Sequence, residues 1–235
     1  MLTPDGEALA RFARDRDDRF VRFLGELRGT PDHRPVVLAA GEGGYLYLLG
    51  DVIREAVAAQ RIRLVNTDRA RTVAAVRAGR AHLGVAVLDV LPDDLVAVPV
   101  RDFDQVLLLP DDHPLARRKR LKVRDLAGLA LVVPPPERPH RIAIERALRG
   151  AGVAWSVAVE AEGWPLTAHF VGLGIGMAVV NGCVTPGPGV TARPIVDLPR
   201  ITYYALHRPG ARDDPRVDAL LARIRAQARL TTMSP

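Results

Sequence analysis

The 235-residue sequence is poor in several features, and each shortage excludes a class of protein. Its one cysteine, Cys183, allows no disulfide within the chain, so a reducing compartment is the simplest expectation. No uncharged stretch approaches the roughly 18 apolar residues of a membrane span. The first apolar run is interrupted by Asp5, Glu7 and Arg11, which is not typical of a signal peptide. We therefore expect a soluble, cytoplasmic protein without a membrane partner.

The sequence also lacks the spacings of metal and cofactor sites. Its six histidines lie far apart and form no H-x-x-x-H or H-E-x-x-H pattern, so we expect no metal and no cofactor. Lysine occurs only at positions 119 and 122, and the formal charge of +6 comes mainly from arginine. The densest basic run, residues 117–124, has no aromatic neighbour for stacking on bases, which favours a solvated loop over a nucleic-acid surface.

What the sequence does contain is a regular alternation of apolar segments. Residues 4–28 carry an amphipathic helical pattern that begins at the Thr3-Pro4 cap and ends at Gly29-Thr30-Pro31. Its apolar stripe needs a partner surface, and pairing with a second copy is favoured over packing on the chain's own body. The stripe consists of Leu9, Phe12, Ala13, Phe20, Phe23, Leu24 and Leu27.

From residue 36 to residue 87, strands and helices alternate, which predicts βαβ units and a parallel sheet. We expect strands at 36–40, 62–66, 82–87, 95–100, 105–109, 130–133, 153–160, 175–180 and 201–206, and helices at 45–59, 69–77, 141–149, 166–172 and 215–228. The late strand and helix must return to the first sheet, so the pattern indicates two α/β lobes joined by two crossings. The expected division is 1–30 for a linker or dimerisation helix, 36–99 plus 201–230 for lobe I and 100–200 for lobe II.

A glycine-rich bend, Gly41-Glu42-Gly43-Gly44, follows the first of these strands. It has no lysine for a phosphate loop, and Leu46 occupies the third glycine position of a dinucleotide fingerprint. Ligands of open α/β sheets bind outside the carboxyl ends of the strands, where both this bend and the loop at residues 134–140 fall. We expect the two segments to face each other across a cleft.

Several motifs in this order resemble the effector-binding domain of LysR-type transcriptional regulators. They are Leu2–Leu9, which is similar to "LTPAGEAL"; Val73–Ala86, similar to "LLxGxLDLAL"; Leu109–Ala116, similar to "LPxxHPLA"; and the segments 126–134 and 171–178. The resemblance implies the fold class: α/β, two Rossmann-like lobes with a ligand cleft between them, like a type 2 periplasmic-binding protein, preceded by an N-terminal helix.

The resemblance also implies a role. It suggests a regulatory domain that binds a small-molecule effector and forms a homodimer, with the helix at 45–59 at the contact between copies. The winged helix-turn-helix that precedes this segment in the family does not appear here, so the chain as written is not expected to bind DNA directly. The alternative is a stand-alone protein on this fold, either a ligand binder or an enzyme such as an isomerase, cyclase or dehydratase.

The candidate ligand contacts come from both lobes. In the family, a small hydroxyl residue at the bend commonly binds an effector carboxylate. Glu42 stands at or beside that position. It either caps its own helix or contacts the ligand. Glu42 and His140 are the candidate acid–base residues of the enzyme alternative. Thr167 offers an available hydroxyl, and Trp164 either stacks on a ligand or fills the core. The full set is Gly41, Glu42, Gly43, Gly44, Pro136, Glu137, Arg138, His140, Trp164 and Thr167.

Overall fold

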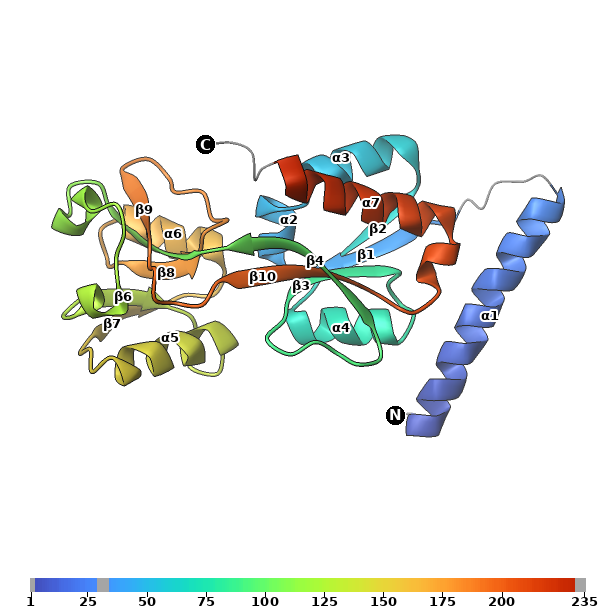
Figure 1. Cartoon of the computed structure of the whole chain (residues 1–235), viewed down its shortest axis with the longest axis horizontal. Coiled ribbons are helices and arrows are strands. Elements are labelled where there is room, and N and C mark those ends of the chain that lie inside the picture. Colours follow the sequence, from blue (N-terminus) through green and yellow to red (C-terminus); the bar gives the residue numbers. More distant parts are fainter. Residues whose placement is uncertain (1–2, 29–33, 231–235) are drawn as a thin grey trace. The chain divides into compact units, whose positions relative to one another are not determined.

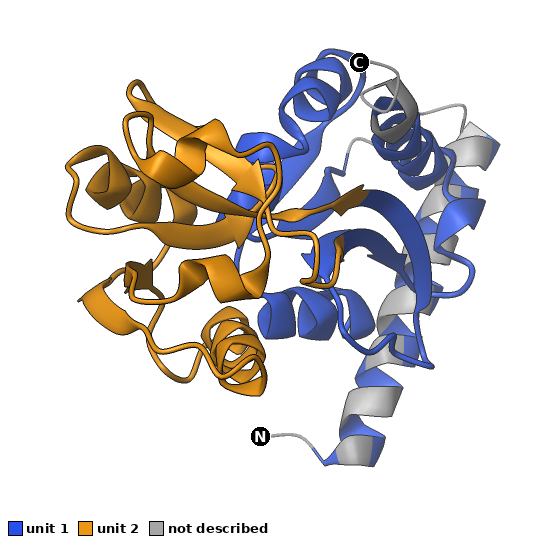
Figure 2. Ribbon diagram, turned by 60° about the vertical axis from the view of Figure 1, so that its left-hand side comes forward, with its two compact units in different colours: residues 1–101, 202–235 blue, residues 102–201 orange. Residues whose placement is uncertain are grey.

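The computed structural model describes residues 3–28 and 34–230 of the chain, and Figure 1 shows its elements. The residues divide into two compact units, coloured separately in Figure 2: residues 1–101 with 202–235, and residues 102–201. Among the described residues, none of the helices has the length and hydrophobicity of a membrane-spanning segment. The motif segment that begins at Leu2 lies partly outside the described residues.

Unit 1 contains a five-stranded sheet in the order β2-β1-β3-β10-β4. Its strands are β1 (Val36–Ala40), β2 (Ile62–Asn66), β3 (Leu83–Val87), β4 (Val96–Phe103) and β10 (Ile201–His207). The first three are parallel, whereas β10 pairs with β3 in the antiparallel direction. The late strand therefore returns to the first sheet, as the sequence predicted.

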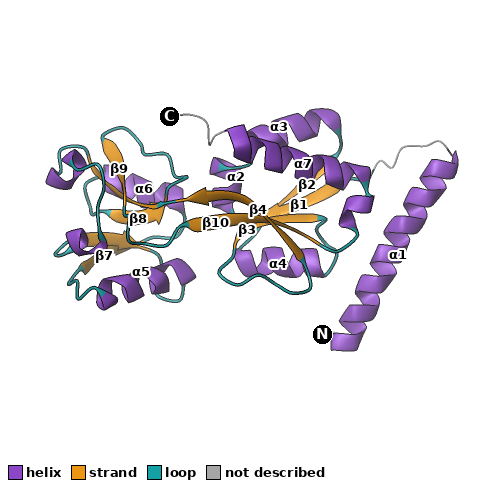
Figure 3. Cartoon of the chain, viewed as in Figure 1, coloured by secondary structure: helices purple, strands orange, loops and turns teal. Residues whose placement is uncertain are grey.

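Helices cover both faces of this sheet (Figure 3). They are α2 (Glu42–Tyr47), α3 (Gly50–Ala59), α4 (Arg69–Arg77) and α7 (Pro215–Leu230), and the short helix η3 (Ala211–Asp213) precedes α7. Val76 of α4 packs with Ala39 and Leu206 on one face. On the other face α3 packs on α7, where the side-chain oxygen of Gln227 accepts a hydrogen bond from the Val52 amide at 3.2 Å.

The single helix predicted over residues 45–59 is wrong. The structure has two helices, α2 and α3, separated at Leu48 and Leu49. Both leucines are buried, and their amides both donate to the Gly44 carbonyl, at 3.1 and 2.9 Å. The Leu48 amide makes the i→i−4 bond of an α-helix, whereas the Leu49 amide reaches the same carbonyl from five residues away, so the regular helical pattern ends here.

Unit 2 contains two small ladders. The strands β5 (Gln105–Pro110), β8 (Ala178–Asn181) and β9 (Val190–Pro194) are antiparallel in the order β8-β5-β9, and β6 (Ala130–Val133) is parallel to β7 (Ser156–Glu160). The backbone of Met177 joins the ladders by exchanging hydrogen bonds with Ala130 and Val132. Leu107, Leu131 and Leu148 lie in the core of this unit.

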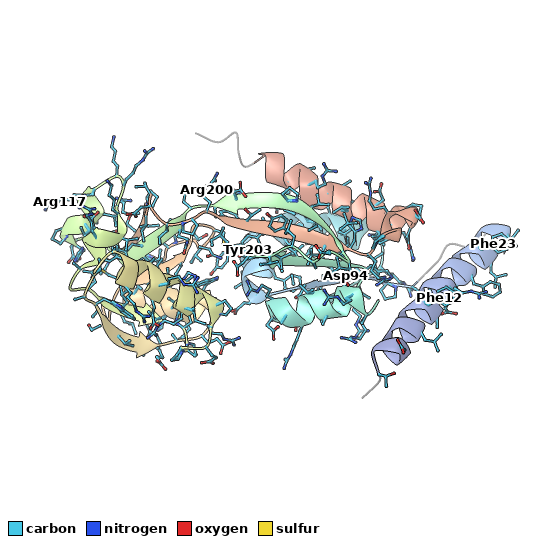
Figure 4. All side chains as sticks on the ribbon, turned by 60° about the horizontal axis from the view of Figure 1, so that its bottom comes forward. Phe12, Phe23, Asp94, Arg117, Arg200 and Tyr203 are labelled. Carbon is cyan, nitrogen blue, oxygen red and sulfur yellow. The ribbon has the colours of Figure 1, made fainter. Side chains whose placement is uncertain are left out.

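The remaining elements of unit 2 are α5 (Pro139–Gly150), α6 (Trp164–Gly172) and the short helices η1 (Pro114–Arg117) and η2 (Val123–Leu126). The basic run lies on η1, η2 and the loop between them, and Arg117 is marked there in Figure 4. Its six basic side chains are exposed, and Arg118 pairs with Asp125 at 2.7 Å. This exposure agrees with the solvated loop that the sequence favoured.

The N-terminal helix α1 spans Pro4–Arg28, the bounds that the sequence predicted. The Thr3 hydroxyl accepts a hydrogen bond from the Gly6 amide at 3.1 Å, which confirms the predicted cap. Along the helix, Leu9, Phe12, Phe20, Phe23 and Leu27 are 55–68% exposed, and Figure 4 labels the side chains of Phe12 and Phe23.

Candidate ligand-binding site

The glycine-rich bend lies at the carboxyl end of β1. Gly41 adopts an extended conformation and its carbonyl accepts from the Tyr45 amide at 3.2 Å, so α2 begins directly after the strand. Gly44 is buried, and a Cβ placed on it would lie 3.5 Å from the Ala40 Cβ, in ordinary contact. The helix therefore lies in van der Waals range of the end of the strand, and an alanine would also fit at position 44.

Glu42 lies in the first turn of α2 and is exposed. Gly41, at the cap position, has no side chain to satisfy the first amides of the helix, and α2 shows no side-chain cap. A carboxylate in the first turn is stabilised by the helix dipole by about 0.3–1 kcal/mol, which explains an acidic residue here without a hydrogen bond. The Glu42 carboxylate remains accessible from solvent.

Tyr45 anchors the bend, and sequence analysis did not single it out as a site residue. Its hydroxyl lies 2.8 Å from the Leu38 carbonyl oxygen and 3.1 Å from that of Val65, and it accepts from the Val65 amide at 3.2 Å. Burial raises the pKa of this phenol, while hydrogen bonds to the backbone act in the opposite direction. The hydroxyl stays protonated at neutral pH and fixes α2 to both β1 and β2.

In unit 2, the first turns of α5 and α6 bring several candidate residues together. The rings of His140 and Trp164 meet edge to face, with centroids 4.9 Å apart and planes at 88°. Arg138, which precedes α5, forms an ion pair with Glu162, which precedes α6. Three of the predicted contacts, Arg138, His140 and Trp164, thus form one cluster, and Glu162 joins it unpredicted.

The protonation state of His140 follows from its surroundings. Its Nε2 lies 2.8 Å from the Val179 carbonyl oxygen, which can only accept, so Nε2 carries the proton. Burial lowers the pKa of His140, and the bond to the Val179 carbonyl offsets part of that effect. The imidazole is therefore neutral at pH 7, with Nε2 committed to the backbone of β8.

The loop that precedes α5 is held by a buried arginine. Arg141 is 6% exposed, and its guanidinium donates to the Pro134 carbonyl at 3.2 Å and to Glu145 Oε1 at 2.6 Å. The same group lies 5.1 Å from the centre of the Trp155 ring. No sequence signal distinguishes Arg141 from the other arginines, because its role depends on contacts with Trp155 and Glu145. The loop leaves Pro136 and Glu137 exposed.

Thr167 differs from the prediction of an available hydroxyl. It is 1% exposed, and its Oγ1 donates to the Gly163 carbonyl at 3.0 Å. The first turn of α6 buries this side chain because position 167 faces the body of unit 2. We therefore correct the candidate set by removing Thr167.

The arrangement offers polar and aromatic groups for binding. Within the described residues, no cluster of three or more His, Cys, Asp or Glu side chains could hold a metal ion. The expectation that the Gly41–Gly44 bend and the loop at 134–140 face each other across a cleft stays a prediction.

Comparison with known proteins identifies the family. Residues 31–229 match the model of the LysR substrate binding domain. The chain belongs to this family. The resemblance drawn from the sequence motifs is thereby confirmed.

Curated relatives of this LysR-family chain include two probable hydrogen peroxide-inducible genes activators. The one from Mycobacterium xenopi is 31% identical over 125 residues, which are 51% of this chain and 66% of that protein. The one from Mycobacterium avium is 30% identical over 159 residues, 64% of this chain and 47% of that protein. The match thus spans about half to two thirds of these relatives.

Solved structures show the same fold. A full-length OxyR variant from Pseudomonas aeruginosa has a TM-score of 0.74 at 19% identity, covering 96% of this chain and 78% of that one. The BenM effector-binding domain with benzoate has a TM-score of 0.71 at 16% identity, covering 86% and 95%. The QuiR effector-binding domain with shikimate has a TM-score of 0.68 at 10% identity, covering 84% and 98%. The LysR-family chain therefore has the predicted two-lobed, type 2 periplasmic-binding-protein fold.

Proposed function

We propose that this chain is the effector-binding part of a LysR-type transcriptional regulator that acts in the cytoplasm. The observation that carries the proposal is the family match over residues 31–229 on the corresponding fold. Such a domain responds to a small molecule only if the ligand has different affinities for two arrangements of the protein. The comparisons give no support to the enzyme alternative, and the bond from His140 Nε2 to a backbone carbonyl does not favour it either.

The regulatory role predicts what the gene encodes next to this domain. A LysR-type regulator needs an element that enters the major groove of DNA, such as a winged helix-turn-helix. We expect the genomic sequence before codon 1 to encode one in frame with Met1. An in-frame stop codon directly upstream would contradict the regulatory role and favour a stand-alone ligand binder.

The ligand is proposed to contact the bend of unit 1 and the cluster of unit 2. The BenM and QuiR domains bind benzoate and shikimate, and both of these ligands are carboxylates. Here the exposed Glu42 lies at the bend, and Arg138 already has a carboxylate partner in Glu162. Since like charges repel, a ligand group near Glu42 should be a cation or a hydrogen-bond donor rather than an anion.

A matched pair of small ligands tests this preference. Benzamidine and benzoate share a phenyl ring and carry opposite charges, so their difference in affinity reports the electrostatics of the site. Isothermal titration should show benzamidine binding at least about tenfold more tightly than benzoate, because a desolvated charge pair contributes of the order of 1–3 kcal/mol. Glu42→Gln should remove most of that difference.

The control for this measurement is Glu137→Gln, which removes the same charge from the exposed loop of unit 2. It distinguishes a local contact at Glu42 from a general change of charge. Equal affinity of the unaltered protein for benzoate and benzamidine would contradict the proposed ligand class.

The chain is also proposed to form a homodimer. Five large apolar side chains of α1 are more than half exposed, namely Leu9, Phe12, Phe20, Phe23 and Leu27, and unit 1 leaves Leu46 of α2 at 55% exposure. Removing apolar surface from water stabilises association by about 25 cal/mol per Å², so these surfaces favour a partner. A second copy presents a matching apolar face on α1, whose five exposed apolar residues lie within one 25-residue helix.

A further inference from the structure

A cavity of about 930 Å³ lies on unit 1, at the amino ends of β1 and β2. Its walls come from the last turn of α3, the segments that lead into the two strands and the first turn of α7, which lie together in Figure 1. Since β1 runs for five residues from the cavity to the bend at Gly41, the two places are about 13 Å apart along the strand. The cavity is therefore separate from the bend that the proposed effector contacts.

The cavity combines an apolar floor with a basic rim. The side chains of Pro35, Val57 and Ile62 contribute to the floor, and Val57 is 59% exposed. The rim carries four arginines: Arg34, Arg61, Arg63 and Arg216. Arginine at the edge of an apolar surface is suited to a molecule with a carboxylate at one end and a hydrocarbon body at the other.

Two of the four arginines belong to the frame of the cavity. Arg216 donates to the Arg34 carbonyl at 2.8 Å and pairs with Asp214 at 2.8 Å. The Gln60 side chain donates to the Arg216 carbonyl at 3.2 Å, and the Val36 amide donates to the Arg61 carbonyl at 3.0 Å. These bonds link α7, α3 and the starts of both strands, so contacts within the protein hold the cavity wall in place.

The other two arginines are available to a ligand. Arg61 and Arg63 are exposed, and in the described part of the chain neither has an acidic or hydrogen-bonding partner for its guanidinium. The carboxyl end of α3 carries partial negative charge and would repel an anion. An anionic group would therefore lie toward Arg61 and Arg63, with its apolar body over Val57.

We propose that this cavity is an accessory binding site for a small amphipathic carboxylate, held by Arg61 and Arg63 and by the apolar floor at Val57. Its volume falls within the range of about 300–1,000 Å³ that is typical of small-molecule sites. The site does not depend on the proposed contacts at Glu42 or His140.

Octanoate and 1-octanol provide the test, since they share a hydrocarbon chain and differ in the charged group. The 235-residue chain is titrated with each while backbone amide shifts are recorded by NMR. Octanoate should shift the amides of residues 57–63 in a saturable way and bind about tenfold more tightly than 1-octanol, as expected for charge-assisted hydrogen bonds.

The double variant Arg61→Ala/Arg63→Ala should weaken octanoate binding about tenfold or more and leave 1-octanol binding unchanged. Arg117→Ala/Arg120→Ala is the matched control, because it removes the same charge from the exposed loop of unit 2 and should bind like the unaltered protein. Four outcomes would each overturn the proposal. They are equal affinity for octanoate and 1-octanol, saturable amide shifts only at Gly41–Gly44, no saturable amide shifts, and an equal loss of octanoate affinity in both double variants.

Discussion

At the scale of single residues, the structure shows two anchoring side chains that the sequence did not indicate. Tyr45 joins the bend to β1 and β2 through one hydroxyl, and Arg141 holds the loop before α5 through Pro134 and Glu145. Neither was predicted, because the partners of each side chain are set by folding. Thr167 is the opposite case. Its hydroxyl was expected to be available to a ligand, but it donates to the Gly163 carbonyl at the start of its own helix.

His140 gives a prediction about pH. Burial lowers its folded-state pKa below the unfolded value of about 6.5, so between the two values the unfolded chain binds more protons. Stability should therefore fall as pH decreases below about 6.5. His140→Gln keeps a donor for the Val179 carbonyl but does not titrate, and it should lose less stability between pH 7.0 and 5.5 in urea unfolding.

The control for this experiment is His169→Gln, at an exposed position on α6. It should keep the pH dependence of the unaltered protein. An identical loss of stability on acidification in His140→Gln and in the unaltered protein would contradict the assignment.

At the scale of elements, the sequence indicated most strands and helices within one to three residues, because apolar periodicity and Gly or Pro boundaries are local signals. There were two exceptions. The sequence did not indicate β9 (Val190–Pro194), and in the 45–59 segment the apolar pattern continues across a break. Leu48 and Leu49 are apolar whether or not the helix is continuous, so the pattern could not show that both are buried. The break is visible only in the structure, where the Leu48 and Leu49 amides share the Gly44 carbonyl.

Gly176 tests the junction between the two ladders of unit 2. A Cβ at this position would lie 2.8 Å from the Ala130 carbonyl oxygen and 2.8 Å from the Ala158 Cβ. Both are backbone or short side-chain atoms that cannot move away without disturbing β6 and β7. Gly176→Ala should lower the free energy of unfolding by about 1–3 kcal/mol in denaturant titration.

Gly150→Ala is the matched control for that change. Gly150 ends α5, and a Cβ there meets nothing within 4 Å, so stability should be unchanged or rise by up to about 1 kcal/mol. Equal effects of the two substitutions would show that the close approach at Gly176 does not constrain the junction.

At the scale of the whole molecule, each unit has its own buried core, and the chain passes from one unit to the other near residues 101–102 and 201–202. The proposed homodimer would cover the five large apolar side chains of α1 that are more than half exposed. Sedimentation velocity at micromolar concentration should show a dimer. Phe12→Asp/Phe23→Asp should shift it toward monomer, because two charges would be placed in the apolar contact.

The variant Asp5→Asn/Asp17→Asn controls for charge on the same helix. Both aspartates are exposed and neither belongs to the apolar stripe, so the dimer should persist. A monomeric unaltered protein would contradict the proposed dimer. If the Phe12→Asp/Phe23→Asp variant remained a dimer, the contact between copies would lie elsewhere than on α1.

The sequence by itself determined the alternation of strands and helices, the cap at Thr3, the position of the bend and the family, because these features depend on neighbouring residues and motif order. The tertiary structure alone decided which side chains remain accessible. It buried Thr167, committed His140 Nε2 to β8, paired Arg138 with Glu162 and left Arg61 and Arg63 open. Burial and pairing depend on contacts between residues far apart in the chain, and the sequence pattern does not show which of these residues are close in space.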